Sequence, residues 1–326
     1  MCRFIMKYFY FILVVFFLMS CDNELDLVAD NQEIPVVYGL LDQSDTAQYI
    51  RVERVFVDKE ISGNVLAQIP DSLYYNDISV KLVRTSNNAE YTLERVDGNL
   101  EGYVRDEGVF ANMPNFMYKI LTEDIPLIEN EEYELRIEGI FEDRAVTSTA
   151  SIVEPPFLLN PMNGGLINFE PNKKVNIGWT PKGEAEIYTA IFYFNVTESN
   201  LGQVSNKRLT WVVAANTDRS NLEADGVDFY SFMSGALSKD PDINRSLNSI
   251  EFELISGNKA IEDYIRVGQA NLGITSSGEI PILSNLSEGL GVFGTTHTHR
   301  RSNIQLTQVS RDSLINGSIT AALNFQ

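Results

Sequence analysis

The stretch Tyr133-Glu134-Leu135-Arg136-Ile137-Glu138 decides the fold class, because apolar and charged side chains alternate along it without error. A period of two is the pattern of a β-strand with one face in a core and the other in water. The same alternation occurs at residues 50–53 and 78–82, and residues 146–152 are rich in the β-branched side chains typical of strands. Short strands at close spacing predict a β-sandwich over residues 33–154.

A second region begins after Glu154-Pro155-Pro156, where two consecutive prolines cannot continue a strand ladder. Residues 175–179 alternate and end in a tryptophan, and residues 186–197 are apolar on both parities, as in a strand covered on both faces. Residues 258–272 have the spacing of an amphipathic helix. The sequence therefore predicts a mainly β protein with two β-sandwich domains that resemble immunoglobulin and fibronectin III domains, the second (residues 155–326) with helical insertions.

The N-terminus has the layout of a cleaved export signal. Arg3 and Lys7 precede an uncharged run, residues 8–19, which is too short to span a hydrocarbon core that needs about 20 apolar residues. Leu18-Met19-Ser20-Cys21 resembles the lipobox of bacterial lipoproteins. That resemblance implies removal of the signal peptide, residues 1–20, by cleavage between Ser20 and Cys21, and a diacylglycerol on the Cys21 sulfur with palmitate-like acylation of the new amino group. The alternative is an ordinary signal peptide followed by a cysteine by chance.

The residues behind Cys21 are polar and acidic, and residues 21–32 are interpreted as a lipidated tether. Acidic residues directly after the lipidated cysteine resemble the surface-export signal of Bacteroidota lipoproteins. The resemblance implies an outer-membrane location with the ectodomain exposed at the cell surface. The alternative is a location on the periplasmic face.

A late stretch, SNLSEGLGVFG at residues 284–294, carries the most specific resemblance. Together with the lipobox, the alternating strand at 133–137 and the Trp179 strand, it resembles a family of Bacteroidota outer-membrane lipoproteins that carry a domain of unknown function. The resemblance implies that the protein acts as an accessory to a TonB-dependent transporter, and it identifies no catalytic residues. Gly289, Gly291 and Gly294 suit positive φ angles or close backbone contact, which predicts a turn packed against the sandwich.

Composition excludes two classes of partner. Loss of residues 1–20 leaves 23 Lys and Arg against 45 Asp and Glu, a net charge of −22. Such a charge repels nucleic acid and anionic lipid, so neither is expected to bind through charge. Because Cys2 leaves with the signal and Cys21 carries the lipid, the mature chain is left with no internal disulfide and no thiol nucleophile.

Two stretches have the residue types of metal ligands. His297 and His299 are two apart on an expected strand, so both rings share a face and suit one metal ion if a carboxylate supplies a third ligand. The alternative is two exposed histidines on an edge strand. A partial match to a calcium loop has Arg245 in the place of its glycine, and the alternative is an Asp-Pro turn with solvated acids. The calcium candidates are Asp240, Asp242, Asn244 and Glu251.

Aromatic pairs offer candidate platforms for a sugar or peptide, or else fill a core. They are Tyr74, Tyr75, Phe229, Tyr230 and Phe232. No nucleophile elbow, phosphate-binding loop, dinucleotide motif or zinc-protease motif occurs, so we expect no enzyme and no cofactor. The sequence predicts a surface lipoprotein that captures a ligand or serves an outer-membrane transporter. The alternatives are a surface polysaccharide hydrolase with paired carboxylates and a structural or adhesive envelope protein.

Overall fold

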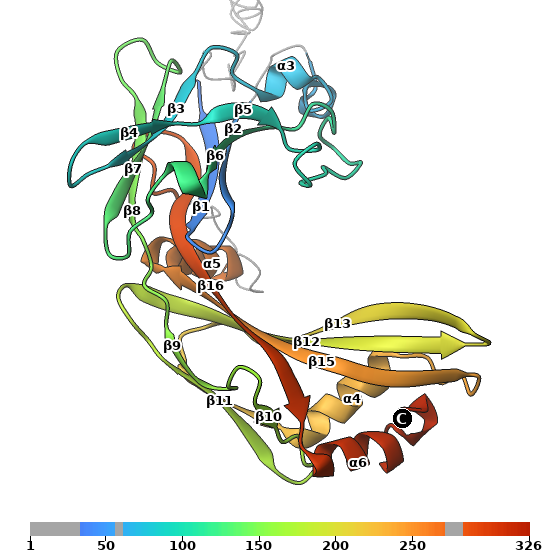
Figure 1. Ribbon diagram of the computed structural model, residues 1–326. Coiled ribbons are helices and arrows are strands. Elements are labelled where there is room, and N and C mark those ends of the chain that lie inside the picture. Colours follow the sequence, from blue (N-terminus) through green and yellow to red (C-terminus); the bar gives the residue numbers. More distant parts are fainter. Residues whose placement is uncertain (1–32, 56–60, 271–282) are drawn as a thin grey trace, which may run out of the picture.

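The computed structural model describes residues 33–55, 61–270 and 283–326. The predicted signal peptide, its cleavage site at Ser20 and Cys21, the lipid attachment at Cys21 and the acidic tether all lie outside these residues. In the described ranges, none of the helices is both long and apolar enough to span a membrane. The chain forms two lobes, one above the other in Figure 1.

The first lobe is a sandwich of two sheets. Its elements are β1 (Pro35–Asp42), β2 (Ala47–Arg54), α2 (Gly63–Leu66), α3 (Pro70–Leu73), β3 (Ser79–Arg84), β4 (Ala89–Thr92), β5 (Glu94–Asp97), β6 (Phe116–Leu121), η1 (Thr122–Asp124), β7 (Glu132–Glu138) and β8 (Val146–Ser151). One sheet has the order β1-β2-β6-β5, and the other has the order β4-β3-β7-β8. Side chains from both sheets meet in one core. The alternation that predicted β7 is confirmed, because Tyr133, Leu135 and Ile137 are fully buried.

The second lobe also packs strands on strands and adds helices. Its elements are β9 (Phe157–Asn160), β10 (Leu166–Ile167), β11 (Lys174–Thr180), β12 (Ala185–Asn200), β13 (Gln203–Thr217), β14 (Asn221–Asp225), α4 (Gly226–Ala236), β15 (Ile243–Asn258), α5 (Lys259–Ala270), β16 (Leu290–Leu306), α6 (Gln308–Asn316) and η2 (Ala321–Leu323). The sheet β13-β12-β15-β16 shares an aromatic core with the small sheet β14-β11-β9 and with α4 and α6 (Figure 1). The predicted central strand at 186–197 is β12, and the predicted helix at 258–272 is α5.

The strand β16 joins the lobes. Its first half pairs with β1 in parallel, from Val36↔Leu290 to Asp42↔Thr296, and its second half pairs with β15 in antiparallel fashion. One sheet of nine strands among the described residues therefore runs through both lobes. Phe293 lies in the first core, whereas Ile304 lies in the second. The region predicted as the C-terminal domain, residues 155–326, thus contributes this strand to the sheet and core of the first lobe.

The stretch at 284–294 forms the entry to β16 and covers the free edge of β8. The Asn285 side chain accepts a hydrogen bond from the Phe293 N–H (2.9 Å) and donates one to the Phe293 carbonyl oxygen (2.6 Å). The backbone N–H of Ser287 donates to the Thr147 carbonyl oxygen at 2.7 Å. Gly289 and Gly291 have φ angles of +92° and +117°, as the sequence predicted, but Gly291 lies inside a strand and not in a turn.

Candidate functional site

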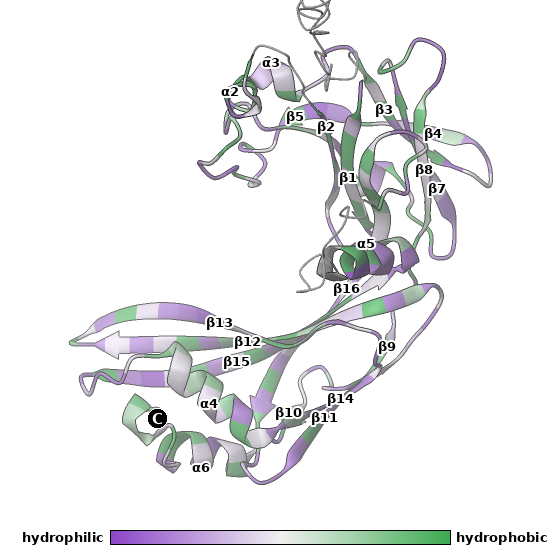
Figure 2. Cartoon of the chain, turned by 180° about the vertical axis from the view of Figure 1, so that it is seen from behind, coloured by the Kyte–Doolittle hydropathy of each residue, from purple (hydrophilic) through white to green (hydrophobic). Residues whose placement is uncertain are grey.

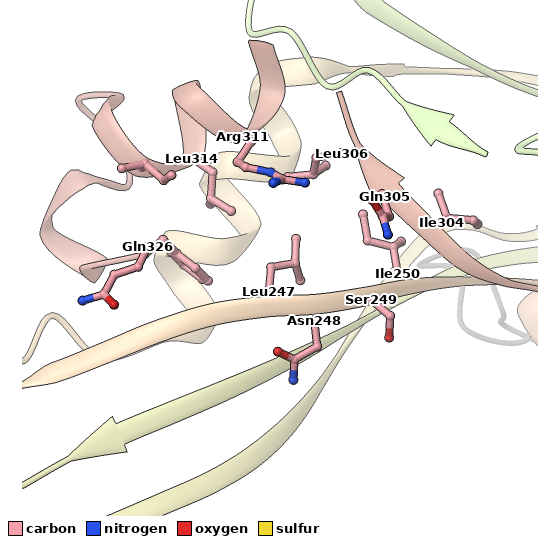
Figure 3. Close-up of a pocket in the computed structure, with 12 residues that line it drawn as sticks. Leu247, Asn248, Ser249, Ile250, Ile304, Gln305, Leu306, Arg311, Leu314 and Gln326 are labelled. Carbon is pink, nitrogen blue, oxygen red and sulfur yellow. The ribbon is translucent and has the colours of Figure 1, made fainter. Parts of the chain in front are cut away.

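A pocket of about 300 Å³ opens in the second lobe where β15 and β16 separate. The two strands pair as far as Ile250↔Ile304, and beyond this pair they diverge. Helix α6 and the end of the chain close the gap from the other side (Figure 3). The pocket is lined by Leu247, Asn248, Ser249, Ile250, Ile304, Gln305, Leu306, Arg311, Leu314, Ile315, Phe325 and Gln326.

The separation of the two strands has a local cause on each of them. In β16, Asn303 has a positive φ of 55°, and after Ile304 the strand leaves β15 and pairs with β10 through Leu166↔Gln305. In β15, the register against β12 slips near Ser249, and Arg245 is bridged by Phe325. Within the described part of the chain, residues 246–249 have no strand partner on their β16 side. Two strand edges therefore face the pocket.

Buried apolar side chains lie directly behind the surface of the pocket. Ile250, Ile304 and Leu306 are buried beneath it, and Leu314 reaches it from α6. Asn248 and Ser249 point to the opposite side of β15 (Figure 3), where their side chains bond to Thr197 and Asn195 of β12. Their polar groups are thus used elsewhere, and the β15 side chains that face the pocket are apolar.

Arg311 supplies the charge of the pocket. It lines the pocket (Figure 3), and its guanidinium has no hydrogen bond or ion pair to any residue that the structure describes. A guanidinium without a carboxylate partner recognises an anionic group through charge-assisted hydrogen bonds. A cavity of this size suits a small ligand, and its exposed surface is mostly polar because the apolar side chains behind it are almost fully buried. The arrangement therefore fits a small polar ligand that carries an anionic group.

The sequence did not reveal this pocket, and only a weak local signal was available. Thr307 caps α6 by accepting a hydrogen bond from the Ser310 N–H, and a threonine before such a run is a recognisable helix start. That signal places Arg311 on a helix but does not show what the helix covers. The pocket depends on strands far apart in sequence, so nothing near Arg311 indicated it.

The two histidines do share a face of β16, as predicted. Their ring centroids are 6.3 Å apart, and both rings are half-buried on a central strand and not exposed on an edge. The Nδ1 atom of His297 is buried without a hydrogen-bond partner. No group of three His, Cys, Asp or Glu side chains in the described residues is arranged to hold a metal ion. The third ligand that the metal prediction required is therefore not in place within those ranges.

We expect the histidine pair to make the protein less stable in mild acid. Burial lowers the pKa of His297, and this effect outweighs the nearby charges of Asp42 and Glu129, which raise it. The pKa of His299 is lowered mainly by burial and further by the positive charge of Arg301. Because each folded pKa lies below the ordinary value of about 6.5, the unfolded chain binds more protons there. The free energy of unfolding should therefore fall as the pH drops from 7.5 to 5.5. Urea unfolding at both values, compared with a His297→Asn/His299→Asn chain, tests this, and an equal loss in both chains would contradict it.

The structure does not assemble the predicted calcium loop. Asn244 and Glu251 lie on the same extended strand, β15, seven residues apart, which corresponds to roughly 23 Å. One cation cannot contact both. Glu251 instead accepts hydrogen bonds from Asn195 (2.7 Å) and Arg208 (2.8 Å), while the Asp240 carboxylate caps the backbone N–H of Asp242 in a turn. The alternative reading, an Asp-Pro turn, describes this segment, and the calcium prediction is corrected accordingly.

The candidate aromatic platforms are mostly core residues. Tyr74 and Tyr75 are buried in the first lobe, and Phe229 and Tyr230 are buried in the second. Phe232 is half-buried and stacks on Trp211, with ring centroids 5.9 Å apart. Rings buried in this way cannot stack on a sugar or peptide, so the alternative that they fill a core replaces the platform prediction.

Comparisons with known proteins give little beyond the fold. No family model matches the chain, and no curated protein matches it. Among solved structures, the FN1-FN3 domains of chicken CNTN1 match with 12% identity and a TM-score of 0.17, covering 83% of this chain and 65% of that one. The calcium binding domain CBD12 of CALX1.1 matches with 11% identity and a TM-score of 0.16, covering 83% of this chain and 99% of that one. Likenesses this weak carry no argument about ligands or partners. The fold class itself is confirmed by the sheets described above: the chain is mainly β, with β-sandwich lobes.

Proposed function

We propose that this chain is a lipoprotein of the outer membrane whose ectodomain captures a small ligand in the pocket beneath α6. The observation that carries the ligand-capturing role is the pocket itself, which combines a mostly polar exposed surface with the unpartnered guanidinium of Arg311. The lipobox and the acidic tether support the anchoring. Surface capture by an anchored protein is useful when the ligand is then passed on, so an outer-membrane transporter is the proposed recipient.

A hydrolase is the less favoured alternative. Paired carboxylates are needed for glycoside hydrolysis, and the pocket beneath α6 is lined by no Asp or Glu. A second cavity, of about 300 Å³, lies near α5 and is lined by Asp218 and Glu262. Glu262, however, is held by Arg266 at 2.6 Å and by Lys259 at 3.3 Å. Two cations therefore hold the Glu262 carboxylate in ion pairs, which is typical of a structural group and not of a catalytic acid or base.

Reversal of the charge at the pocket should abolish capture of anionic ligands. The ectodomain without the lipidated cysteine, residues 22–326, is applied to peptide and glycan arrays, and the affinity of the strongest anionic binder is then compared between the natural and Arg311→Glu ectodomains. A charge-assisted hydrogen bond contributes about 1.5–3 kcal/mol, so the affinity should fall at least about tenfold. Arg219→Glu is the matched control, because Arg219 is an exposed arginine outside the pocket. An array without any binder, or a binder that tolerates Arg311→Glu, would count against capture at this site.

The anchoring half of the proposal has its own test. Mass spectrometry of the mature N-terminus should find Cys21 as the first residue with acyl chains attached. Cells fed a palmitate analogue should label the natural chain and leave a Cys21→Ala chain unlabelled. A protein with an unmodified N-terminus that is released into the medium would contradict the proposed membrane anchoring.

A further inference from the structure

Large apolar side chains are exposed together at one end of the first lobe. We call this set the apolar tip, and it consists of Val65, Ile69, Leu100, Tyr103, Val104, Val109, Phe110 and Met113. They come from α2, from the residue before α3 and from the loop between β5 and β6. The exposed fractions of Leu100, Val104 and Met113 are 87%, 70% and 70%. Contiguous apolar exposure of this kind marks a surface that meets another apolar phase.

The β5–β6 loop is held from within by its polar groups. Asn115 is fully buried, and its side chain donates to the Tyr103 carbonyl oxygen (2.7 Å) and accepts from Arg51 (2.6 Å). Asn99 likewise accepts from the backbone N–H of Arg105 and donates to the Asn112 carbonyl oxygen. Two asparagines of the loop are thus used in internal bonds, while its apolar side chains face outward together with those of Asp106 and Glu107.

Helices α2 and α3 are fastened to the same loop. The backbone N–H of Ala111 donates to the Ala67 carbonyl oxygen at 2.7 Å, and the Gln68 side chain donates to the carbonyl oxygens of Gly108 and Val109. Val65 and Ile69 are thus fixed beside the loop. Figure 2 shows α2, α3 and this loop on the same side of the first lobe. These bonds join the part of the apolar tip near Val65 and Ile69 to the part near Val109 and Phe110.

The apolar tip lies where the described chain begins. Pro35 at the start of β1 pairs with Arg54 at the end of β2, and Phe116 at the start of β6 pairs with Asp97 at the end of β5. The Arg54 guanidinium donates to the Ser72 carbonyl oxygen at 3.0 Å, which ties α3 to the same end. All these strand ends therefore face the same way as the point at which the chain enters from residue 33.

The length of chain before that point limits how far the tip can be from the anchor. Residues 21–32 cannot span more than about 40 Å even when fully extended. If Cys21 carries the lipid, the end of the first lobe that bears the apolar tip is kept within this distance of the bilayer.

We infer that the apolar tip is a second membrane contact, which rests in the interface between headgroups and acyl chains and holds the ectodomain in one orientation. The inference rests on the lipid anchor of the proposed function. Arg105 is already paired with Glu53, and Asp106 and Glu107 are exposed nearby, so these described residues offer no free cation to anionic lipid. The partner is therefore a zwitterionic bilayer, entered by apolar side chains to a shallow depth.

The cysteine content of the chain permits a direct test. Once Cys2 is removed and Cys21 is acylated, Val109→Cys introduces a unique thiol for an environment-sensitive dye. The full lipidated chain is placed in phosphatidylcholine vesicles that contain nitroxide-labelled lipid. We expect strong quenching and a blue shift at position 109. Leu201→Cys is the matched control, because Leu201 is 95% exposed at the turn between β12 and β13 in the second lobe, and its dye should stay unquenched.

A second variant separates insertion from mere proximity. Val104→Ser and Met113→Ser, added to the Val109→Cys chain, remove exposed apolar groups without touching a core, and should restore much of the aqueous signal. A dye at 109 that stays in water on a chain whose Cys21 acylation is confirmed by mass would overturn the inference and leave the proposed function standing. Absence of acylation would instead defeat the proposed function. Burial of the dye without vesicles, rising with protein concentration, would assign the tip to a second copy and also overturn the inference.

Discussion

Replacement of Glu198 by leucine is expected to lower the free energy of unfolding by about 3–5 kcal/mol, because it leaves a buried charge without its partner. The charge belongs to Arg245, whose side chain is fully buried in the second lobe. Its Nε donates to Glu198 at 2.8 Å, and its other nitrogens donate to the Leu323 carbonyl oxygen and to Ser238. An arginine cannot escape the cost of burial by losing its proton.

The state of Glu198 supports this expectation. Burial alone raises the pKa of the carboxyl, but hydrogen bonds from Lys207 and Arg245 outweigh it and bring the pKa below its ordinary value. The carboxylate therefore stays ionised at neutral pH and forms a true ion pair. Its contribution to stability is present above the pKa of the unfolded chain and is lost as the pH falls toward the folded pKa.

A double variant distinguishes a broken pair from lost packing. Glu198→Leu combined with Arg245→Met removes both charges, and most of the stability should return because matched apolar replacement of a buried pair is often close to neutral. Lys207→Ala serves as the control, since Lys207 is a half-exposed partner of Glu198 and should contribute at most about 1 kcal/mol. Urea unfolding of the four chains measures all of this. A double variant no more stable than Glu198→Leu would refute the account.

Replacement of Gly291 by alanine is expected to have the other large effect, a loss of at least about 3 kcal/mol. Gly291 has a φ of +117°, which side chains rarely adopt, and a Cβ there would overlap the Val37 carbonyl oxygen of β1. The strain and the overlap act together at the pairing of Val37 with Gly291. The variant should therefore loosen the parallel pairing of β1 with β16 and expose the first core.

Hydrogen exchange and urea unfolding together check this expectation. Protection should be lost first in β1 and in residues 290–296, while β12 and β13 keep theirs. Gly235→Ala is the control, because Gly235 is in α4 with open space around its α-carbon, and alanine there should be neutral or stabilising by up to about 1 kcal/mol. Equal stability of the Gly291→Ala chain and the natural chain would show that the backbone can shift to accept the side chain.

The sequence was informative where a side-chain pattern reports burial directly. The alternation at residues 133–138 predicted β7 with its inward face, and the run at 186–197 predicted a central strand because both of its faces are covered. The helix at 258–272 was visible from its period, and Asn258 accepts a hydrogen bond from the backbone N–H of Ile261 as a capping residue does. In each case the cause lies within a few residues of the effect.

Prediction failed where the outcome depends on distant partners. The aromatic residues Tyr74 and Phe229 look the same in sequence whether they face a ligand or a core, and only the folded chain shows that they are buried. The spacing of Glu251 fits a calcium loop, but pairing with β12 places this residue in the long strand β15. Arg311 belongs to a pocket that forms where two strands separate. The apolar side chains of the tip are exposed in a loop that is held by hydrogen bonds from buried asparagines such as Asn115.

The long strand β16 also has a consequence for how the chain folds as it is synthesised. β1 is among the first elements to leave the ribosome, but its neighbour across the sheet is synthesised roughly 250 residues later. Pairs this distant in sequence form slowly, because a large loop must close before the contact is gained. Until β16 is made, the first lobe therefore has an open strand edge along β1 and lacks the Phe293 ring. A product truncated before residue 290 keeps that open edge, which proteases and chaperones recognise as a sign of an unfinished molecule.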